Sequence, residues 1–192
     1  MNKIFLYSIL IFLNSCSILQ INTGYSELFG TIKNYAFNSD VKLTEQFIKD
    51  FPYSFAMVKI GRSPSIRMVL LSVDNDIYEW VSSDKIKIFT KRGKIVKTIG
   101  LEFDIEFYDF TSTKEIYFPQ TFIVDFYNPK LYGIKVKSDF EIIQNQIKES
   151  SSYIQIDWNI INLYMLMDGK VSESIQRIHP HFPEIRMQFF IK

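Results

Sequence analysis

The chain has few of the residues that most often carry out chemistry. Its 192 residues include one cysteine, two histidines and seven glycines. One cysteine excludes a disulfide within the chain, and His179 and His181 are too few to complete the three or four ligands of a typical metal site. Pro180 lies between them, which favours a stiff loop before the last strand. With no glycine-rich phosphate loop, Gly-x-Ser-x-Gly elbow or His-Glu-x-x-His motif present, we predict no metal, no cofactor and no enzymatic activity.

Clustered charge of one sign is also missing. The chain has 22 basic and 21 acidic residues, for a net charge of +1, and neither kind forms a long run. Nucleic acids and anionic membrane surfaces are bound by lysine and arginine gathered on one face. We therefore expect no nucleic-acid partner and no polybasic membrane patch.

The main apolar run is at the N-terminus, from Ile4 to Leu13. It is too short for a transmembrane helix, which needs about 20 apolar residues. It is followed by Asn14-Ser15-Cys16, and this arrangement is typical of a bacterial lipoprotein signal. We expect residues 1–15 to be cleaved and Cys16 to carry acyl chains such as palmitate. Residues 16–23 then form the lipidated cysteine and a short tether.

Two alternatives stay open for this segment: an ordinary secretory signal with an incidental cysteine, or a cytosolic chain with an apolar start. Lipidation explains why an exported chain has an unpaired cysteine. Stable anchoring needs more than one acyl chain, and a triacylated cysteine meets that need. Ser17 is not the aspartate that usually retains lipoproteins in the inner membrane. The expected location is the outer membrane of the cell envelope, with the domain facing the periplasm.

Residues 24–192 are expected to form a single β-rich domain. The apolar spacing predicts a helix over residues 25–36, and Thr44 is a plausible N-cap for a second, short helix that ends at Asp50. From there, short segments rich in β-branched and aromatic residues alternate with turn signals, of which Asp168-Gly169 is the clearest. Strands are predicted over residues 53–60, 66–73, 77–81, 86–90, 95–99, 122–127, 153–160 and 185–191.

About nine or ten short strands in all predict an all-β fold. We expect an antiparallel, partly open β-barrel or a strongly curved sheet, with an N-terminal helix packed across it. In the strand over residues 153–160, Trp158 is expected to share one face with Ile154 and Ile160. Residues 117–149 show little pattern beyond a turn at Asn128-Pro129.

Two groups of side chains suggest carbohydrate chemistry, and each has a structural alternative. Trp80 and Trp158 suggest sugar stacking, but the area of an indole ring favours a place in the core. Asp104, Glu106 and Asp109 suggest the paired carboxylates of a glycosidase. Because they alternate with aromatic and apolar residues, we favour the solvated side of an edge strand or loop.

Several short phrases occur in a characteristic order from residue 25 to the C-terminus. They are Tyr25-Ser26-Glu27-Leu28; Pro52-Tyr53-Ser54 with Gly61; Met68-Val69-Leu70; Glu79-Trp80; Thr90 with Gly93; Lys97-Thr98-Ile99-Gly100-Leu101; Trp158; Gly169-Lys170-Val171; Ser174 with Gln176; and Phe189-Phe190-Ile191-Lys192. In this order they resemble the group 4 capsule polysaccharide lipoproteins, the GfcB/YjbF family. The resemblance implies a partly open β-barrel lipoprotein that works with proteins exporting or assembling surface polysaccharide, and it supplies no catalytic residue.

The favoured function is therefore a non-enzymatic lipoprotein, anchored at Cys16, that assists export or assembly of capsule or exopolysaccharide. The alternative is a periplasmic carrier that shelters the acyl chain of a lipid or glycolipid in a half-open barrel, because the apolar strand residues could line a cavity. A carbohydrate-modifying enzyme that uses the acids at 104–109 is a third hypothesis.

Overall fold

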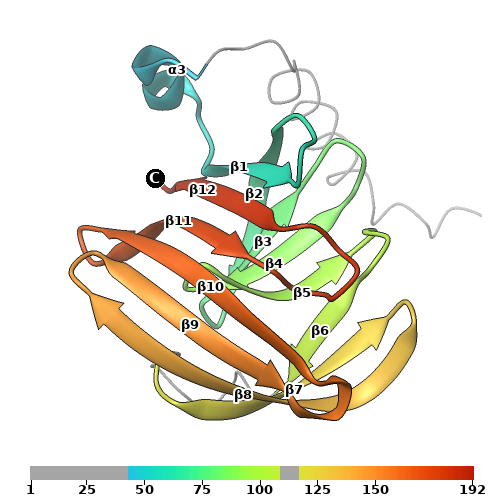
Figure 1. Cartoon of the computed structure of the whole chain (residues 1–192). Helices are drawn as coiled ribbons and strands as arrows, with labels where there is room; N and C mark the ends of the chain where they lie inside the picture. The colour runs from blue at the N-terminus through green and yellow to red at the C-terminus, as the bar shows by residue number, and fades with distance from the viewer. Residues whose placement is uncertain (1–42, 109–116) are drawn as a thin grey trace, which may run out of the picture. The chain divides into compact units, whose positions relative to one another are not determined.

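Twelve antiparallel strands form a closed barrel in the computed structural model, which describes residues 43–108 and 117–192. Each strand pairs with its neighbours in the sequence, and β1 pairs with β12 to close the ring (Figure 1). The strands are β1 Phe55–Ile60, β2 Ile66–Asp74, β3 Ile77–Val81, β4 Lys87–Lys91, β5 Lys94–Ile99, β6 Ile105–Tyr108, β7 Gln120–Tyr127, β8 Lys130–Ile143, β9 Gln146–Tyr153, β10 Trp158–Met167, β11 Lys170–Gln176 and β12 Ile185–Phe190. The predicted antiparallel all-β barrel is confirmed, although its ring is closed where we expected it to be partly open.

The hairpin turns follow from residues that accept a positive φ. At Arg92-Gly93 between β4 and β5 the φ angles are 49° and 83°, and at Asp168-Gly169 between β10 and β11 they are 52° and 73°. Two successive positive φ values define the tight turns whose twist matches that of antiparallel strands. The turn predicted at Asp168-Gly169 is confirmed.

One short helix, α3 Glu45–Asp50, precedes the barrel and begins where the sequence predicts. The Thr44 side chain accepts a hydrogen bond from the Phe47 N–H at 3.1 Å, which is the N-cap interaction. The helix predicted over residues 25–36 lies outside the described residues, as do Cys16, the cleavage site and the tether. No helix in the described part of the chain is long and apolar enough to cross a membrane.

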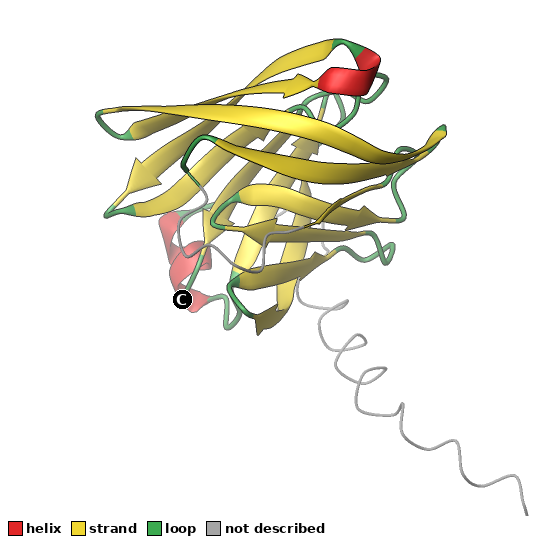
Figure 2. Ribbon diagram, turned by 90° about the horizontal axis from the view of Figure 1, so that it is seen from below, coloured by secondary structure: helices red, strands yellow, loops and turns green. Residues whose placement is uncertain are grey.

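Helix α3 is held at one end of the barrel by aromatic and cationic contacts. The rings of Phe47 and Phe51 lie 6.1 and 5.1 Å from that of Phe55 at the start of β1. The guanidinium carbon of Arg67 on β2 lies 4.6 Å from the centre of the Phe47 ring, within cation–π range. The Lys192 ammonium donates to the backbone carbonyl of Phe51. Both chain ends of the barrel therefore meet at the helix (Figures 1 and 2).

Two of the strand predictions are wrong in instructive ways. Residues 153–160 do not form one strand: β9 ends at Tyr153, a 3₁₀ turn covers Ile154–Ile156, and Asp157 has a φ of 47° before β10 begins. Tyr153 and Trp158, expected on opposite faces, are therefore paired across a hairpin. In residues 117–149, where little pattern was visible, the chain forms the long strand β8 and the first half of β9.

The core fills much of the lumen, because inward-facing side chains alternate with solvated ones along each strand. Its members have almost no exposed surface and are mostly aliphatic or aromatic. They include Ala56, Val58, Met68, Trp80, Ile88, Ile105, Phe122, Val124, Phe126, Val136, Ile185 and Met187. The lumen is also narrow in one direction, because Gly93 on the β4–β5 turn lies against Val171 on β11.

This close approach makes a specific prediction about two glycines. A Cβ at Gly93 would lie 2.5 Å from Val171 Cγ1, whereas a Cβ at Gly169 would meet nothing within 4 Å. Both positions have positive φ, so Gly169→Ala should cost about 1–2 kcal/mol in the free energy of unfolding. Gly93→Ala adds overpacking and should cost about 2–4 kcal/mol. Urea denaturation of both variants checks this, and equal losses would contradict the close packing of the turn on β11.

Candidate functional site

The two ends of the barrel differ in how they are covered. Because successive strands alternate in direction, the β2–β3, β4–β5, β8–β9 and β10–β11 turns lie at one end, with α3 and the C-terminus. The loop of residues 177–184, between β11 and β12, lies at the other. There His179 is buried, with its ring 4.7 Å from that of Phe103 and 4.6 Å from that of Phe126. This packed loop fills the far end.

A cavity of about 540 Å³ lies at the end that carries the hairpin turns, and we call it the mouth cavity. Its wall comes from turns and strands that are distant in the sequence. The lining residues are Asp76, Tyr78, Trp80, Thr90, Arg92, Gly93, Tyr117, Ile142, Ile147, Leu166, Gly169, Lys170, Val171, Phe189 and Ile191. The charged members, Asp76, Arg92 and Lys170, sit on or beside the turns, so they mark the rim. The mouth cavity has the size and the mixed lining of a small-molecule site.

Trp80 forms the inner wall of the mouth cavity and has no exposed surface. Its indole N–H donates to Thr90 Oγ1 at 2.8 Å, and its ring stacks on Tyr78 and contacts Phe189. Trp158, the other candidate for stacking, is half-buried, and its ring lies 4.5 Å from that of Tyr153. The structure therefore does not bring the two tryptophans to one surface.

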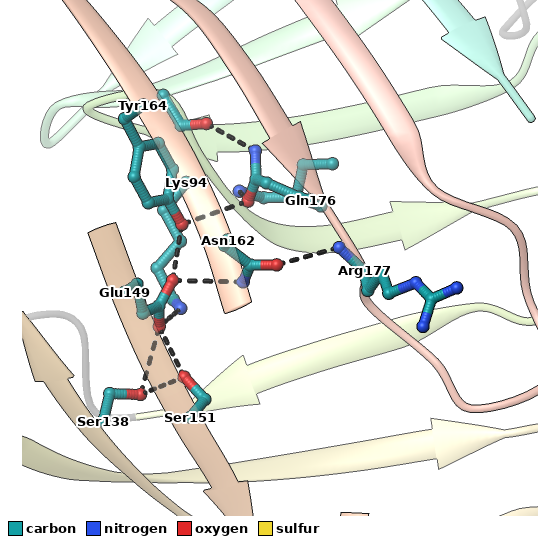
Figure 3. Close-up of polar contacts among 10 residues, drawn as sticks. Lys94, Ser138, Glu149, Ser151, Asn162, Tyr164, Gln176 and Arg177 are labelled. Atoms are coloured by element: carbon teal, nitrogen blue, oxygen red, sulfur yellow. Dashed lines mark hydrogen bonds and ion pairs between the residues drawn. The ribbon is translucent and has the colours of Figure 1, made fainter. Parts of the chain in front are cut away.

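A cluster of buried polar side chains comes from strands β5, β8, β9 and β10 (Figure 3). At its centre is Glu149 on β9, which has no exposed surface. One carboxylate oxygen, Oε1, pairs with the Lys94 ammonium from β5 and accepts from Ser138 at 3.0 Å and Ser151 at 2.9 Å. The other, Oε2, accepts from Asn162 and Tyr164 on β10 at 3.1 and 2.6 Å. We call these six side chains the lumen cluster.

The lumen cluster joins opposite walls of the barrel. Gln176 on β11 lies 3.4 Å from the Tyr164 hydroxyl, and its amide reaches across to β5. There its Oε1 accepts from the Ile95 N–H at 2.9 Å and its Nε2 donates to the Gly93 carbonyl at 2.8 Å. Gly93 also lines the mouth cavity. The same bonds that cross the lumen therefore fix one wall of the cavity.

The electrostatics of the lumen cluster favour the ionised pair. Burial alone would raise the pKa of Glu149, but the charge of Lys94 and the hydrogen bonds from Lys94, Tyr164 and Asn162 outweigh it and lower that pKa. Burial, together with the negative charge of Glu149, raises the pKa of Tyr164 well above its ordinary value. Lys94 also lies within cation–π distance of Phe107 and Phe122, at 5.1 and 5.3 Å. Both oxygens of the Glu149 carboxylate accept hydrogen bonds, so this side chain holds the surrounding strands together.

The acidic residues considered for glycosidase chemistry have structural partners. Asp104 accepts from Thr98 Oγ1 at 2.9 Å and from the Gly100 N–H at 2.8 Å, which shapes the turn between β5 and β6. Glu106 pairs with Lys97 at 2.7 Å on the outer face of the same two strands. Asp109 lies outside the described residues. Asp104 and Glu106 thus stabilise the junction between β5 and β6.

The two histidines lie in different environments. His179 is buried and its Nδ1 accepts from the His181 N–H at 3.2 Å, whereas His181 is exposed. Burial lowers the pKa of His179 to about 4, and the nearby His181 adds to the effect. Within residues 43–108 and 117–192, no group of three or more histidine, cysteine, aspartate or glutamate side chains is placed to hold a metal ion.

A second hollow, the outer cleft, measures about 790 Å³ and lies along β8, β9 and β10. Most of its lining faces outward, but the buried Ser151 and Ile160 also contribute to it. It runs along the part of β10 before Leu163, which is not paired with β11. Lys137, Asp139, Arg177 and Glu184 line it together with serines, so charges of both signs are balanced there. Its polar, open character contrasts with the mouth cavity.

The sequence predicted none of the lumen cluster. Its members are polar residues on strands, which are usually solvated, and Lys94 and Glu149 are separated by 55 positions. A signal was available in β9, where Glu149 and Ser151 share the period-two face of Ile147 and Tyr153. This alternation was hidden because we did not recognise β9 as a strand.

The sequence of this chain is similar to those of known bacterial lipoproteins. Residues 19–116 match the family described as group 4 capsule polysaccharide lipoprotein gfcB, YjbF. The lipoproteins YjbF and GfcB of Escherichia coli K12 are 29% and 27% identical to the chain over 94 residues, which are 47% of this chain and 41% of each relative. The matched stretch thus spans less than half the length of these relatives.

A solved structure shares the fold at low sequence identity. The crystal structure of the hypothetical lipoprotein YmcC from Escherichia coli K12 superposes with a TM-score of 0.65 and 16% identity. The match covers 87% of this chain and 94% of that one. The barrel described above is therefore an architecture that a lipoprotein already adopts.

The energetic coupling between Lys94 and Glu149 in the lumen cluster can be measured. Lys94→Met leaves the buried carboxylate of Glu149 without its counter-ion, and Glu149→Gln leaves a buried ammonium, so each should cost about 3–5 kcal/mol. Removing both charges should cost clearly less than the sum of the single changes. Urea denaturation of the three variants measures the coupling, and additive losses would contradict it.

The buried histidine predicts a pH dependence of stability. The unfolded chain binds a proton at this residue below its ordinary pKa of 6.5, but the folded protein does so only near a pKa of about 4. Between these values the unfolded state holds more protons, so stability should fall as the pH drops through this window. His179→Gln should flatten that part of the profile, and His181→Gln, at the exposed neighbour, should leave it in place. Identical profiles for wild type and His179→Gln would show that His179 is not the group responsible.

Proposed function

This chain belongs to the group 4 capsule polysaccharide lipoprotein family, and from that premise we propose that it assists the export or assembly of a capsule or exopolysaccharide at the cell envelope. The family match over residues 19–116 carries the proposal. That range includes β1 to β6, which form half of the barrel and the Trp80 wall of the mouth cavity.

The arrangement of charged groups supports a role without bond chemistry. A catalytic site brings titratable groups together around a point that a substrate can reach. Here both carboxylate oxygens of the buried Glu149 already have hydrogen-bond donors within the barrel. Asp104 and Glu106 stabilise the junction between β5 and β6. The mouth cavity instead offers a concave surface suited to binding.

We further propose that the lipid on Cys16 confines this barrel to the periplasmic side of the outer membrane. Tethering raises the effective concentration of a domain near other proteins in the same membrane. The partners expected from this placement are the proteins that export or assemble the polysaccharide. The barrel then acts as a binding module beside them.

A single substitution tests the anchor and the function together. Cys16→Ser removes the only thiol that can be acylated, so the protein should move from the membrane fraction to the soluble periplasmic fraction. Surface polysaccharide should then fall toward the level of a strain lacking the gene. Ser17→Ala is the control, because it changes the adjacent hydroxyl without touching the thiol.

Each result of this test has a definite meaning. If Cys16→Ser stays in the membrane fraction although residues 1–15 have been removed, the lipid anchor is refuted. If the protein is released and surface polysaccharide is unchanged, tethering at the membrane is not part of its role.

A further inference from the structure

The mouth cavity presents apolar side chains to water where a solvated surface would carry polar ones. Ile142 at the end of β8 and Ile191 after β12 both line it, with 61% and 44% of their surface exposed. Leu166, Val171 and Phe189 continue the apolar lining from β10, β11 and β12. Apolar surface gathered in a concavity is typical of a ligand site, because binding removes it from water.

We propose that the mouth cavity binds one acyl chain of an amphiphilic lipid, with the polar end of the lipid at the rim. A closed barrel with an open mouth is an architecture that holds a single small ligand among inward-facing side chains. The volume of about 540 Å³ lies within the range of small-molecule pockets, about 300–1,000 Å³. The proposal goes beyond the proposed role in polysaccharide export and is independent of it.

The walls of the mouth cavity favour an apolar occupant over a sugar. A sugar needs free hydrogen-bonding groups around its ring, but the Trp80 N–H and the Thr90 hydroxyl are bonded to each other, and the Trp80 ring has no exposed face. The amide of Gln176 behind the wall is bonded to the backbone of β5. Polar groups that already form hydrogen bonds within the protein are not available to a ligand, and breaking those hydrogen bonds costs free energy.

The rim provides a place for the polar end of the lipid. Arg92 and Lys170 lie on the β4–β5 and β10–β11 sides of the mouth cavity, and Asp76 is the one acidic residue among the lining side chains. A phosphate or carboxylate beside the two cations would be attracted by their charge. The chemistry shared by the candidate ligands is therefore an acyl chain with an anionic head.

The β8–β9 hairpin offers a matched pair of substitutions. Ile142 lines the mouth cavity, whereas its neighbour Ile143 points to the opposite face of the strand and is exposed to a similar degree, 52%. Because both side chains are largely exposed, an aspartate at either position should leave the barrel folded. Only Ile142→Asp places a carboxylate where the acyl chain would lie.

The experiment measures binding of a fluorescent fatty acid, cis-parinaric acid, to the full chain carrying Cys16→Ser, purified without detergent. Ile142→Asp should weaken binding by about tenfold or more, because the chain then meets a charge that must be desolvated. Ile143→Asp should bind like the parent. Ile191→Asp, at a second lining position, should weaken binding as Ile142→Asp does, and circular dichroism confirms that each variant is folded.

Two competitors identify the source of the ligand. Displacement of the probe by palmitoyl lysophosphatidylglycerol as well as by palmitate supports a lipid headgroup at the rim, and displacement by palmitate alone supports a free fatty acid. Absence of probe binding, or equal binding by the Ile142→Asp and Ile143→Asp variants, would overturn the proposal. Displacement by an oligosaccharide of the cell's own polymer would overturn it in favour of a sugar site. Surface polysaccharide is measured separately, so failure here leaves the proposed export role intact.

Discussion

The ion pair between Lys94 and Glu149 is the contact on which the interior of this barrel depends. A ring of twelve strands encloses a wide lumen. Contacts across the lumen are therefore needed to hold its opposite walls in one arrangement. The ammonium from β5 and the carboxylate from β9 meet there, with hydroxyl and amide donors around them. A buried ion pair adds little net stability compared with apolar packing. What it contributes here is a defined geometry, because the pair is satisfied only when β5 faces β8, β9 and β10 in one arrangement.

That geometry determines the shape of the mouth cavity. Gln176 continues the lumen cluster onto β11 and draws the β4–β5 turn against Val171, where a side chain at Gly93 would not fit. The lumen is thereby divided into a packed part, closed at the far end by His179 and Phe103, and an open part at the mouth. A barrel with one closed and one open end is suited to the binding that we propose for the mouth cavity.

Much of the fold could be predicted from local patterns, and the parts that could not have physical reasons. Turns with a glycine or aspartate at positive φ, such as Asp168-Gly169, and the Thr44 N-cap are decided by neighbouring residues. The break at Asp157 could not be predicted in this way, because a 3₁₀ turn and one left-handed residue reverse the chain inside a segment whose residues alternate as they would in a single strand. The lumen cluster depends on contacts between strands far apart in the sequence, and the single chain gave no sign that Glu149 faces Lys94. The lipoprotein signal at Cys16 lies outside the described residues and stays a prediction.

The measurement that tests the central claim most directly is the amount of surface and cell-retained polysaccharide in a strain lacking this gene, with outer-membrane lipids recorded in parallel. Our account predicts that surface polymer falls while lipid composition is unchanged, and that the wild-type gene restores it. Normal surface polymer with altered lipids would contradict a role in polysaccharide export and would indicate that the protein is a lipid carrier.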